Sequence, residues 1–355
     1  MSTTSSIAGY EVTREESVQR VLADLVAMLN TTRRQEVDER RFDWMYRSNP
    51  DGEAALWFVR NGSGVVAGFA AALPRRMLVQ GQQRTCWNCA DLSVLPQFRR
   101  NGLAVRLRQA ARAGVEQGQV DFLYAHPNAA AAGAHEKAGN LAVGQMVRYA
   151  RPLRSAAYLD HLLRSRTLSR AAAAVIDPVL RLSGGGVFHR MAHRVRIVNH
   201  CRFDERFDVL FERYAAAAAV LGIRDAGYLN WRYTENPMYA THAVLAEDEG
   251  RLCGYLLFMR TDDQLLVKDV FPPCDPGVLR DLVSAVIREG FRQEMQSVSV
   301  TLLEGSPVLS VFEEFGFSLR PDRSRMFAYA PTECPFREDV LQAKSWFLTV
   351  GDRDV

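Results

Sequence analysis

An arginine-rich turn lies where a predicted strand passes into a predicted helix. The turn spans Arg99 to Ala104 and reads RRNGLA. Alternating Leu92 and Val94 predict a strand before it, and Pro96 ends that strand. The first turn of a helix has backbone N–H groups without an intrahelical acceptor, and its dipole favours an anion. The turn is therefore suited to hold a phosphate.

The spacing Arg99-x-x-Gly102-x-Ala104 resembles the (Gln/Arg)-x-x-Gly-x-(Gly/Ala) signature of the GNAT acyltransferases, in which this loop holds the pyrophosphate of coenzyme A. The alternative is an ordinary strand–turn–helix with a solvated arginine pair. The resemblance implies acetyl-CoA as acyl donor and no metal. It implies coenzyme contacts at Leu92, Ser93, Val94, Arg99, Arg100, Asn101, Gly102, Leu103, Ala104 and Asn128.

The order of predicted elements extends this resemblance to about 140 residues. Apolar periodicity and turn residues predict strands at 9–13, 54–60, 64–73, up to 95, 120–125 and 141–149, and helices at 15–29, 42–49, 102–114 and before Gly139. A turn is expected over 76–81. Strand, helices, antiparallel strands, phosphate loop, helix, strand, helix and strand follow one another as in a GNAT domain.

The chain then repeats itself. Residues 229–237 match 42–50 at an offset of 187 (231 minus 44), with Trp, Tyr, Asn and Pro identical, and a predicted hairpin follows in both copies. The second copy lacks the arginine–glycine pattern and carries three prolines where backbone donors would be needed. We expect it to bind no coenzyme A and to complete the substrate cleft, dimerise or stabilise the first domain. An independent second active site is the alternative.

These observations predict an α/β (α+β) protein of two tandem GNAT-like domains, each a mixed, mostly antiparallel central sheet flanked by helices. A length of 355 residues with 48% hydrophobic content suffices for two cores. The predicted parts are an N-terminal domain for coenzyme binding and catalysis (1–150), a basic helical linker (151–190), a degenerate C-terminal domain (191–330) and a tail (331–355).

Positive charge is concentrated in residues 151–200. This stretch has nine arginines and two aspartates, or 9 minus 2, which is +7, whereas the whole chain is +3. Its apolar spacing predicts amphipathic helices interrupted by Pro178 and by Ser183 to Gly186. We favour a linker that packs on both domains with solvated arginines; contact with a membrane surface, a polyanionic substrate or an acyl carrier protein is the alternative.

Composition excludes several classes of protein. The net charge of +3 gives no reason to expect a nucleic acid partner, and no apolar run approaches the length of a transmembrane segment. The start of the chain lacks a basic region followed by an apolar core, so we expect a cytoplasmic protein, with a homodimer left open. Six scattered cysteines indicate free thiols, although Cys86 and Cys89 form a CxxC for which zinc or redox chemistry is the alternative to buried strand thiols.

The resemblance implies direct transfer of an acyl group from a thioester to an amine, which requires a base, an oxyanion donor and an acid. His135 occupies the position of the family's usual tyrosine acid, but Asn140 follows Gly139 where a Phe is usual. Tyr124 and His126 are the alternative acids. Asp91 is the candidate base, and Asn88 could orient a water instead.

We therefore predict an N-acyltransferase that moves an acetyl or short acyl group from coenzyme A to a small-molecule amine. The ending from Trp346 to Asp354 resembles GNAT-like proteins of surface-polysaccharide pathways, which suggests an amino sugar acceptor. Trp44 and Tyr46 are interpreted as core anchors, or else as a wall of the acceptor pocket. Two rival functions are an N-acyltransferase that takes a longer acyl group from acyl carrier protein, and a non-catalytic protein that binds acyl-CoA.

Overall fold

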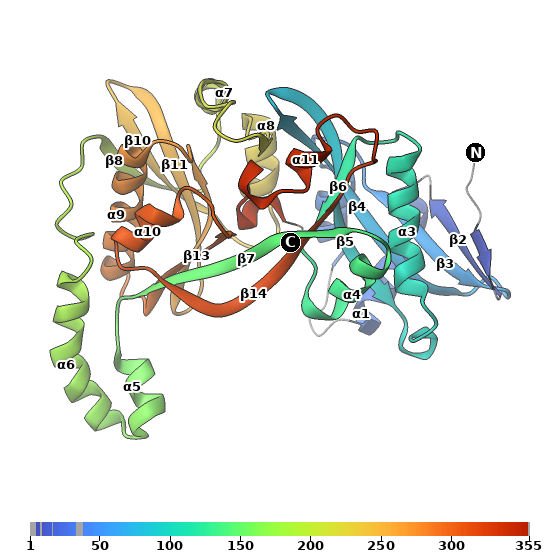
Figure 1. Ribbon diagram of the computed structural model, residues 1–355. Helices are drawn as coiled ribbons and strands as arrows, with labels where there is room; N and C mark the ends of the chain where they lie inside the picture. The colour runs from blue at the N-terminus through green and yellow to red at the C-terminus, as the bar shows by residue number, and fades with distance from the viewer. Residues whose placement is uncertain (1–4, 8, 16, 33–37, 354–355) are drawn as a thin grey trace.

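The computed structural model describes residues 5–7, 9–15, 17–32 and 38–353. One mixed sheet runs through the described chain in the strand order β1-β2-β3-β4-β5-β6-β14-β7-β13-β12-β11-β10-β8, and helices flank it (Figure 1). The predicted α/β class is confirmed. No helix of the described residues is long and apolar enough to cross a membrane.

The first half begins with a strand pair and two helices and continues as a hairpin-rich sheet. Its elements are β1 (Ser5–Ile7), β2 (Tyr10–Glu15), α1 (Val18–Thr32), α2 (Glu39–Phe42), η1 (Asp43–Arg47), β3 (Ala55–Asn61), β4 (Val66–Val79), β5 (Gln82–Val94), η2 (Pro96–Phe98), α3 (Leu103–Glu116), β6 (Phe122–Ala125), α4 (Ala129–Lys137) and β7 (Leu141–Pro152). The turn expected over 76–81 is shorter, because β4 continues to Val79 and only Gln80 (φ 52°) and Gly81 (φ 74°) form the hairpin loop.

The second half repeats this order after two linker helices. Its elements are α5 (Ala156–Leu163), α6 (Arg166–Leu182), β8 (Arg194–Asn199), α7 (Glu205–Arg213), β9 (Val220–Gly222), α8 (Ala226–Leu229), η3 (Asn230–Thr234), β10 (His242–Asp248), β11 (Arg251–Arg260), β12 (Gln264–Phe271), α9 (Pro276–Arg292), β13 (Ser297–Leu303), α10 (Leu309–Glu314), β14 (Ser318–Tyr329), α11 (Arg337–Val340), η4 (Ala343–Ser345), β15 (Trp346–Phe347) and η5 (Val350–Asp352). From η3 to β14, each element corresponds in order to one between η1 and β7.

The two halves exchange their last strands. β7 of the first half pairs with β13 of the second, and β14 of the second half pairs with β6 of the first. β14 and β7 also pair with each other, so the sheet crosses from one half to the other without an edge between them (Figure 1). A break at residue 150 therefore separates segments of sequence but does not separate the sheet.

Trp44 and Trp231 meet at the junction of the two halves. Their rings stack with centroids 5.2 Å apart, and each indole N–H donates to the backbone oxygen of the other residue, at 2.7 and 2.8 Å. Both side chains are buried, as are Tyr46 and Tyr233. The repeated aromatic segment is therefore a core anchor that joins the copies by near-symmetric contacts.

The linker helices differ from our expectation. α6 continues through Pro178 and ends only at Leu182. α5 and α6 pack against each other because the chain reverses at Arg164 (φ 50°), and the hairpin projects from the body instead of packing on both halves (Figure 1). Its base is held to the body by Arg151, which donates to the backbone oxygens of Leu180 and Ser183.

The cysteines are all free thiols. Cys86 and Cys89 are both buried in β5, and the Cys86 thiol donates to the backbone oxygen of Arg75 at 3.4 Å. Burial raises the pKa of Cys86 well above its usual value.

Candidate active site

A gap opens in the first half between β5 and β6. The two strands pair in parallel only from Cys86 to Asn88 and from Phe122 to Tyr124. Beyond these residues β5 continues to Val94 without pairing to β6. The register of β5 on β4 shifts at the same level, and Asp91 is the extra residue of this bulge. A bulge bends its strand, so the gap and the bulge are parts of one distortion.

Two buried arginines hold the bulge from different elements. Arg41 of α2 donates to both carboxylate oxygens of Asp91, at 3.0 and 3.2 Å, and the Tyr46 hydroxyl donates to the same carboxylate at 2.5 Å. Arg108 of α3 donates to the backbone oxygens of Ala71 (3.2 Å) and Ala90 (2.7 Å). The Arg41 and Tyr46 bonds satisfy the buried Asp91 carboxylate, and the Arg108 bonds satisfy backbone oxygens beside the bulge. They favour a positioning role for Asp91 over the predicted role of base, which stays a prediction.

The predicted phosphate turn follows the far end of β5 after the short helix η2. Arg99, Arg100 and Asn101 are exposed, and Arg100 (φ 66°) and Gly102 (φ 71°) adopt left-handed backbone conformations. Gly102 is the N-cap of α3 and provides no side-chain cap, so the first-turn N–H groups keep their capacity for an acceptor. Leu103 is buried and Ala104 half-buried behind the turn. The structure thus brings two cations to an uncapped helix start.

The corresponding helix start in the second half has the opposite character. α9 begins at Pro276, and the Asp275 carboxylate caps it by accepting from the backbone N–H of Val278 at 3.1 Å. The Tyr214 hydroxyl donates to the other Asp275 oxygen at 3.1 Å. A capped and negatively charged helix start repels an anion. This difference supports our prediction that only the first half binds coenzyme A.

The Tyr124 side chain is hydrogen-bonded to the tail of the chain. Its hydroxyl donates to the backbone oxygen of Asp352 at 2.8 Å, and the Asn88 amide donates to the same oxygen at 3.1 Å. Both side chains are buried, and burial raises the pKa of Tyr124 well above its usual value. Tyr124 is therefore protonated at neutral pH, and as acid it would have to exchange this bond for one to the leaving group.

His135 and Asn128 contribute to the structure of α4. His135 is 1% exposed, stacks on Phe327 with centroids 5.7 Å apart, and has Nδ1 3.1 Å from the Asn140 amide. Burial, and then the charge of Arg108, lower the pKa of His135 to about 2. Asn128 is the N-cap of α4 and accepts from the backbone N–H of Ala131 at 3.0 Å. The surroundings of His135 favour a structural role, and its role as acid stays a prediction.

His126 has a different environment. It follows β6 where the gap opens and is 2% exposed, yet neither ring nitrogen has a hydrogen-bond partner in the described part of the chain. Burial, and then the charge of Arg353, lower the pKa of His126 to about 3, although Asp352 acts in the opposite direction. An unpartnered buried imidazole is costly for folding and suits a ligand that supplies the missing bonds. The sequence signal was its position at the end of a buried strand.

These lowered pKa values predict a loss of stability in mild acid. Each imidazole must remain neutral in the folded protein, whereas it binds a proton below about pH 6.5 in the unfolded chain. The stabilisation is present above pH 6.5 and is lost as the pH falls toward the folded-state value. Between about pH 6.5 and pH 5 each histidine should cost roughly 2 kcal/mol of unfolding free energy. Urea denaturation at several pH values measures this, and His126→Leu should reduce the pH dependence by about one such contribution.

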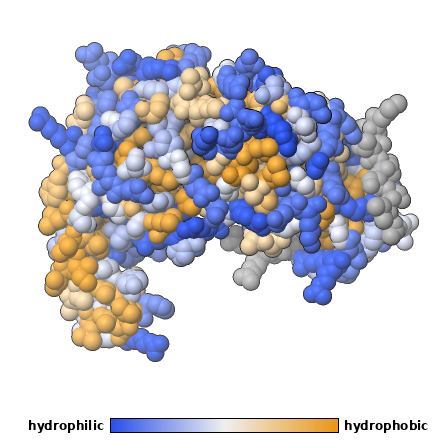
Figure 2. Space-filling view, in the orientation of Figure 1, coloured by the Kyte–Doolittle hydropathy of each residue, from blue (hydrophilic) through white to orange (hydrophobic). Residues whose placement is uncertain are grey.

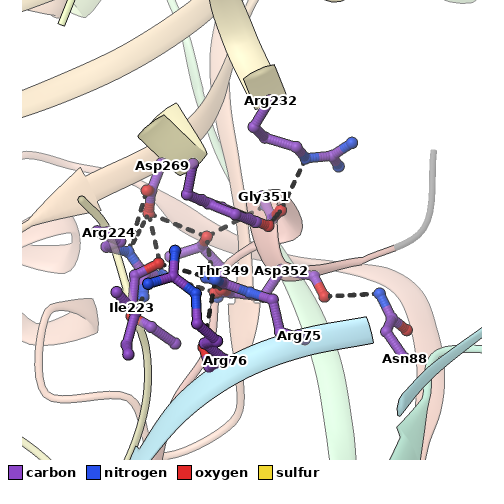
Figure 3. Close-up of polar contacts among 12 residues, drawn as sticks. Arg75, Arg76, Asn88, Ile223, Arg224, Arg232, Asp269, Thr349, Gly351 and Asp352 are labelled. Atoms are coloured by element: carbon purple, nitrogen blue, oxygen red, sulfur yellow. Dashed lines mark hydrogen bonds and ion pairs between the residues drawn. The ribbon is translucent and has the colours of Figure 1, made fainter. Parts of the chain in front are cut away.

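A buried polar network joins the two halves beneath the gap (Figure 3). The Asp352 carboxylate pairs with Arg75 of β4 at 3.3 Å and with Arg224, which follows β9, at 2.6 Å. Arg224 also pairs with Asp269 of β12 at 3.1 Å. Burial alone would raise the pKa of Asp352, but Arg224 and Arg75 outweigh it and lower the pKa. The tail thereby holds both halves in one position around the gap.

Part of the first half is similar to a known protein family. Residues 20–139 match the acetyltransferase (GNAT) family, a range that contains the bulge, the gap and the phosphate turn. No curated protein matches the chain significantly.

Solved structures share the fold over most of the chain. One is a GCN5-related N-acetyltransferase from Anabaena variabilis (TM-score 0.64, 14% identity, 90% of this chain and 72% of that one). Another is a probable N-acyltransferase from Enterococcus faecalis (TM-score 0.63, 12% identity, 96% of this chain and 75% of that one). A third is Saccharomyces cerevisiae N-myristoyltransferase with bound myristoyl-CoA (TM-score 0.57, 11% identity, 92% of this chain and 83% of that one). The family match and the fold agree: the N-terminal half of this chain carries an acetyltransferase (GNAT) family domain, and the chain shares its overall fold with solved acyltransferases.

Proposed function

We propose that the first half transfers an acetyl or other short acyl group from coenzyme A directly to the amine of a small molecule. The observation that carries the proposal is that β5 borders the gap and leads, through η2, to the predicted phosphate turn. A pyrophosphate at Arg99, Arg100 and the start of α3 would direct the pantetheine arm along residues Leu92 to Val94. The thioester would then reach the bulge and His126.

The proposed role of His126 is to hold the reacting thioester or its leaving thiolate by hydrogen bonding. A neutral imidazole offers one N–H donor and one acceptor at the same time. The lowered pKa keeps His126 in this form at neutral pH, so it acts as a hydrogen-bonding group without carrying a charge. Tyr124 lies beside it, with ring centroids 6.1 Å apart, and is the second candidate donor.

This role predicts different effects at the two buried histidines. His126→Leu should reduce kcat about 10- to 100-fold while coenzyme affinity is retained, because one hydrogen-bonding group for the transition state is lost. Its stability should be unchanged or higher, since two unpartnered buried nitrogens are removed. His135→Leu is the matched control: it should lose stability because Asn140 loses its partner, with kcat per folded molecule retained. Steady-state kinetics and thermal unfolding of both variants measure the contrast, and equal kcat at His126→Leu would exclude this role.

A cavity beside α2 supports an amine acceptor. It has a volume of about 500 Å³, and its lining includes Glu39, Asp43, Trp44 and Glu235. Arg40 and Arg47 line it as well, and Arg47 pairs with Asp43 at 2.6 Å, so Glu39 and Glu235 are the carboxylates that would attract a protonated amine. The amino sugar suggested by the chain ending remains our preferred acceptor, although the tail itself serves to join the halves.

Turnover with a panel of amines tests the proposal. Purified protein should release free thiol from acetyl-CoA only when an acceptor amine is present, and amino sugars and their nucleotide-linked forms belong in the panel. Because one structural neighbour carries bound myristoyl-CoA, longer acyl-CoA donors and acyl carrier protein are tested in parallel. Tight coenzyme binding without thiol release on every acceptor would instead identify a non-catalytic acyl-CoA-binding protein.

A further inference from the structure

The hairpin of α5 and α6 carries an apolar surface that no other part of the described chain covers. The hairpin projects from the second half, and Figure 2 shows hydrophobic side chains along it. Nine of the fifteen large hydrophobic side chains that are exposed among the described residues lie between Tyr158 and Phe188. Scattered exposed apolar residues are normal, but a concentration on one projecting element marks a docking surface.

The exposed apolar residues of α6 lie on one helical face. Leu168, Val175, Val179 and Leu182 follow one another at intervals of seven, four and three residues and are 59–72% exposed. The side that is buried in the hairpin is occupied by the small residues Ser169 and Ala173. The large apolar side chains therefore point away from the protein's own core. We call Leu168, Val175, Val179 and Leu182 the apolar stripe.

Arginines line the other flank of α6. Arg166, Arg170 and Arg181 share a face by their spacing of four and eleven residues, and all three are exposed. Arg170 and Arg181 have no carboxylate partner within the described ranges, and Arg166 approaches Asp160 only to 4.0 Å. The helix thus combines an exposed apolar stripe with cations that are available to an anionic partner.

A basic cavity lies at the base of the hairpin, between α6 and α9. Its volume is about 730 Å³, and it is lined by Leu153, Arg154, Asp177, Pro178, Arg181, Val187, Arg288, Phe291 and Arg292. Arg154 and Arg292 are paired with Glu294 and Glu289. Arg181 and Arg288 have no such partner in the part of the chain that the structure covers, and the Arg288 Nε is buried without an acceptor. Arg288 donates to the backbone oxygen of His189 and Arg181 lies over the Phe291 ring, but no carboxylate neutralises either charge within the described residues. Apolar walls with two uncompensated guanidinium charges suit an anionic headgroup whose chain continues into apolar surroundings.

We propose that the α5–α6 hairpin docks the protein on the surface of a membrane that contains anionic lipids. The apolar stripe would enter the boundary between headgroups and acyl chains, and the arginines would lie at the phosphate level. Charge complementarity favours this partner over a second copy of the chain. The hairpin offers only Asp160 and Asp177 to the arginines of another hairpin, and Asp177 already accepts from the backbone N–H and hydroxyl of Ser155.

Vesicle sedimentation with the full chain tests this inference. The wild-type protein should bind vesicles of phosphatidylcholine with about one third phosphatidylglycerol, bind phosphatidylcholine alone at least tenfold more weakly, and be released by salt. Val175→Asp with Val179→Asp, and separately Arg170→Glu with Arg181→Glu, should each weaken the partition by about 30-fold. The altered residues are exposed, so circular dichroism should show retained folding.

A matched control carries the same charge change elsewhere. Arg251→Glu with Arg260→Glu alters two exposed arginines of β11 and should leave vesicle binding within about twofold. Absence of binding, equal binding to neutral vesicles, or wild-type binding by the stripe variant would each overturn the proposal. If light scattering shows a wild-type dimer that becomes a monomer in the variant with Val175→Asp and Val179→Asp, and no vesicle binding is seen, the surface would be assigned to a second copy of the chain.

Discussion

Replacing Arg99 and Arg100 together by glutamate is expected to abolish coenzyme A binding. The two arginines flank an uncapped helix start, and the substitution exchanges two cations for two anions where the pyrophosphate should lie. Each charge-assisted contact to a phosphate is worth roughly 1.5–3 kcal/mol, so the dissociation constant should rise by about 100-fold or more. Isothermal titration calorimetry with coenzyme A measures the loss.

Two further variants separate a specific site from a general charge effect. The Arg251→Glu and Arg260→Glu pair makes the same change of net charge on β11 of the second half and should retain wild-type affinity. Gly277→Lys alters the α9 start, where Asp275 already caps the helix, and should also retain it. Unchanged affinity in the Arg99 and Arg100 variant, or an equal loss in either control, would place the coenzyme elsewhere.

Asp352→Ala should lower the free energy of unfolding by about 3–5 kcal/mol. Its carboxylate is 2% exposed and is shared by Arg75 and Arg224, which are themselves 3% and 1% exposed. Removing it leaves buried positive charge with less compensation, and the capping bonds to the backbone N–H and hydroxyl of Thr349 are lost as well. Urea denaturation followed by circular dichroism measures the change.

Asp322→Ala provides the matched comparison. Asp322 is 65% exposed and pairs with Arg148 at 3.0 Å, a contact that solvent screens, so its removal should cost no more than about 1 kcal/mol. A loss at Asp352 as small as this would mean that the tail is dispensable and that other contacts hold the two halves together.

Several features of the fold and of the candidate site could be predicted because they depend on residues that are close together in the sequence. The spacing of Arg99, Gly102 and Ala104 predicted an anion site at a helix start because the cap and the charges lie within six consecutive residues. The buried periodicity of α1 and α3 predicted helices close to those observed. The match of the Trp44 and Trp231 segments revealed the repeat, because each copy needs the same aromatic anchor.

Other features depend on contacts between residues far apart in the chain. The bulge at Asp91 arises from a register shift against β4, and Asp91 then meets Arg41, fifty residues earlier. No local pattern distinguishes His135, which has Asn140 and Phe327 as neighbours, from His126, whose nitrogens have none. Burial and partners decide the chemistry of an imidazole, and both are tertiary properties.

The sequence alone thus predicted the family resemblance, the repeat and the arginine-rich turn that only the first half carries, because each of these begins from a short stretch of consecutive residues. Only the tertiary structure decided that β7 and β14 exchange places, that Asp352 joins Arg75 to Arg224, and that the α5–α6 hairpin exposes its apolar stripe. Strand pairing and side-chain burial are settled by competition among distant segments for the same partners. The arginine-rich turn is formed by consecutive residues and could therefore be predicted from them. The gap beside it depends on how β5 pairs with β4 and β6, which only the tertiary structure shows.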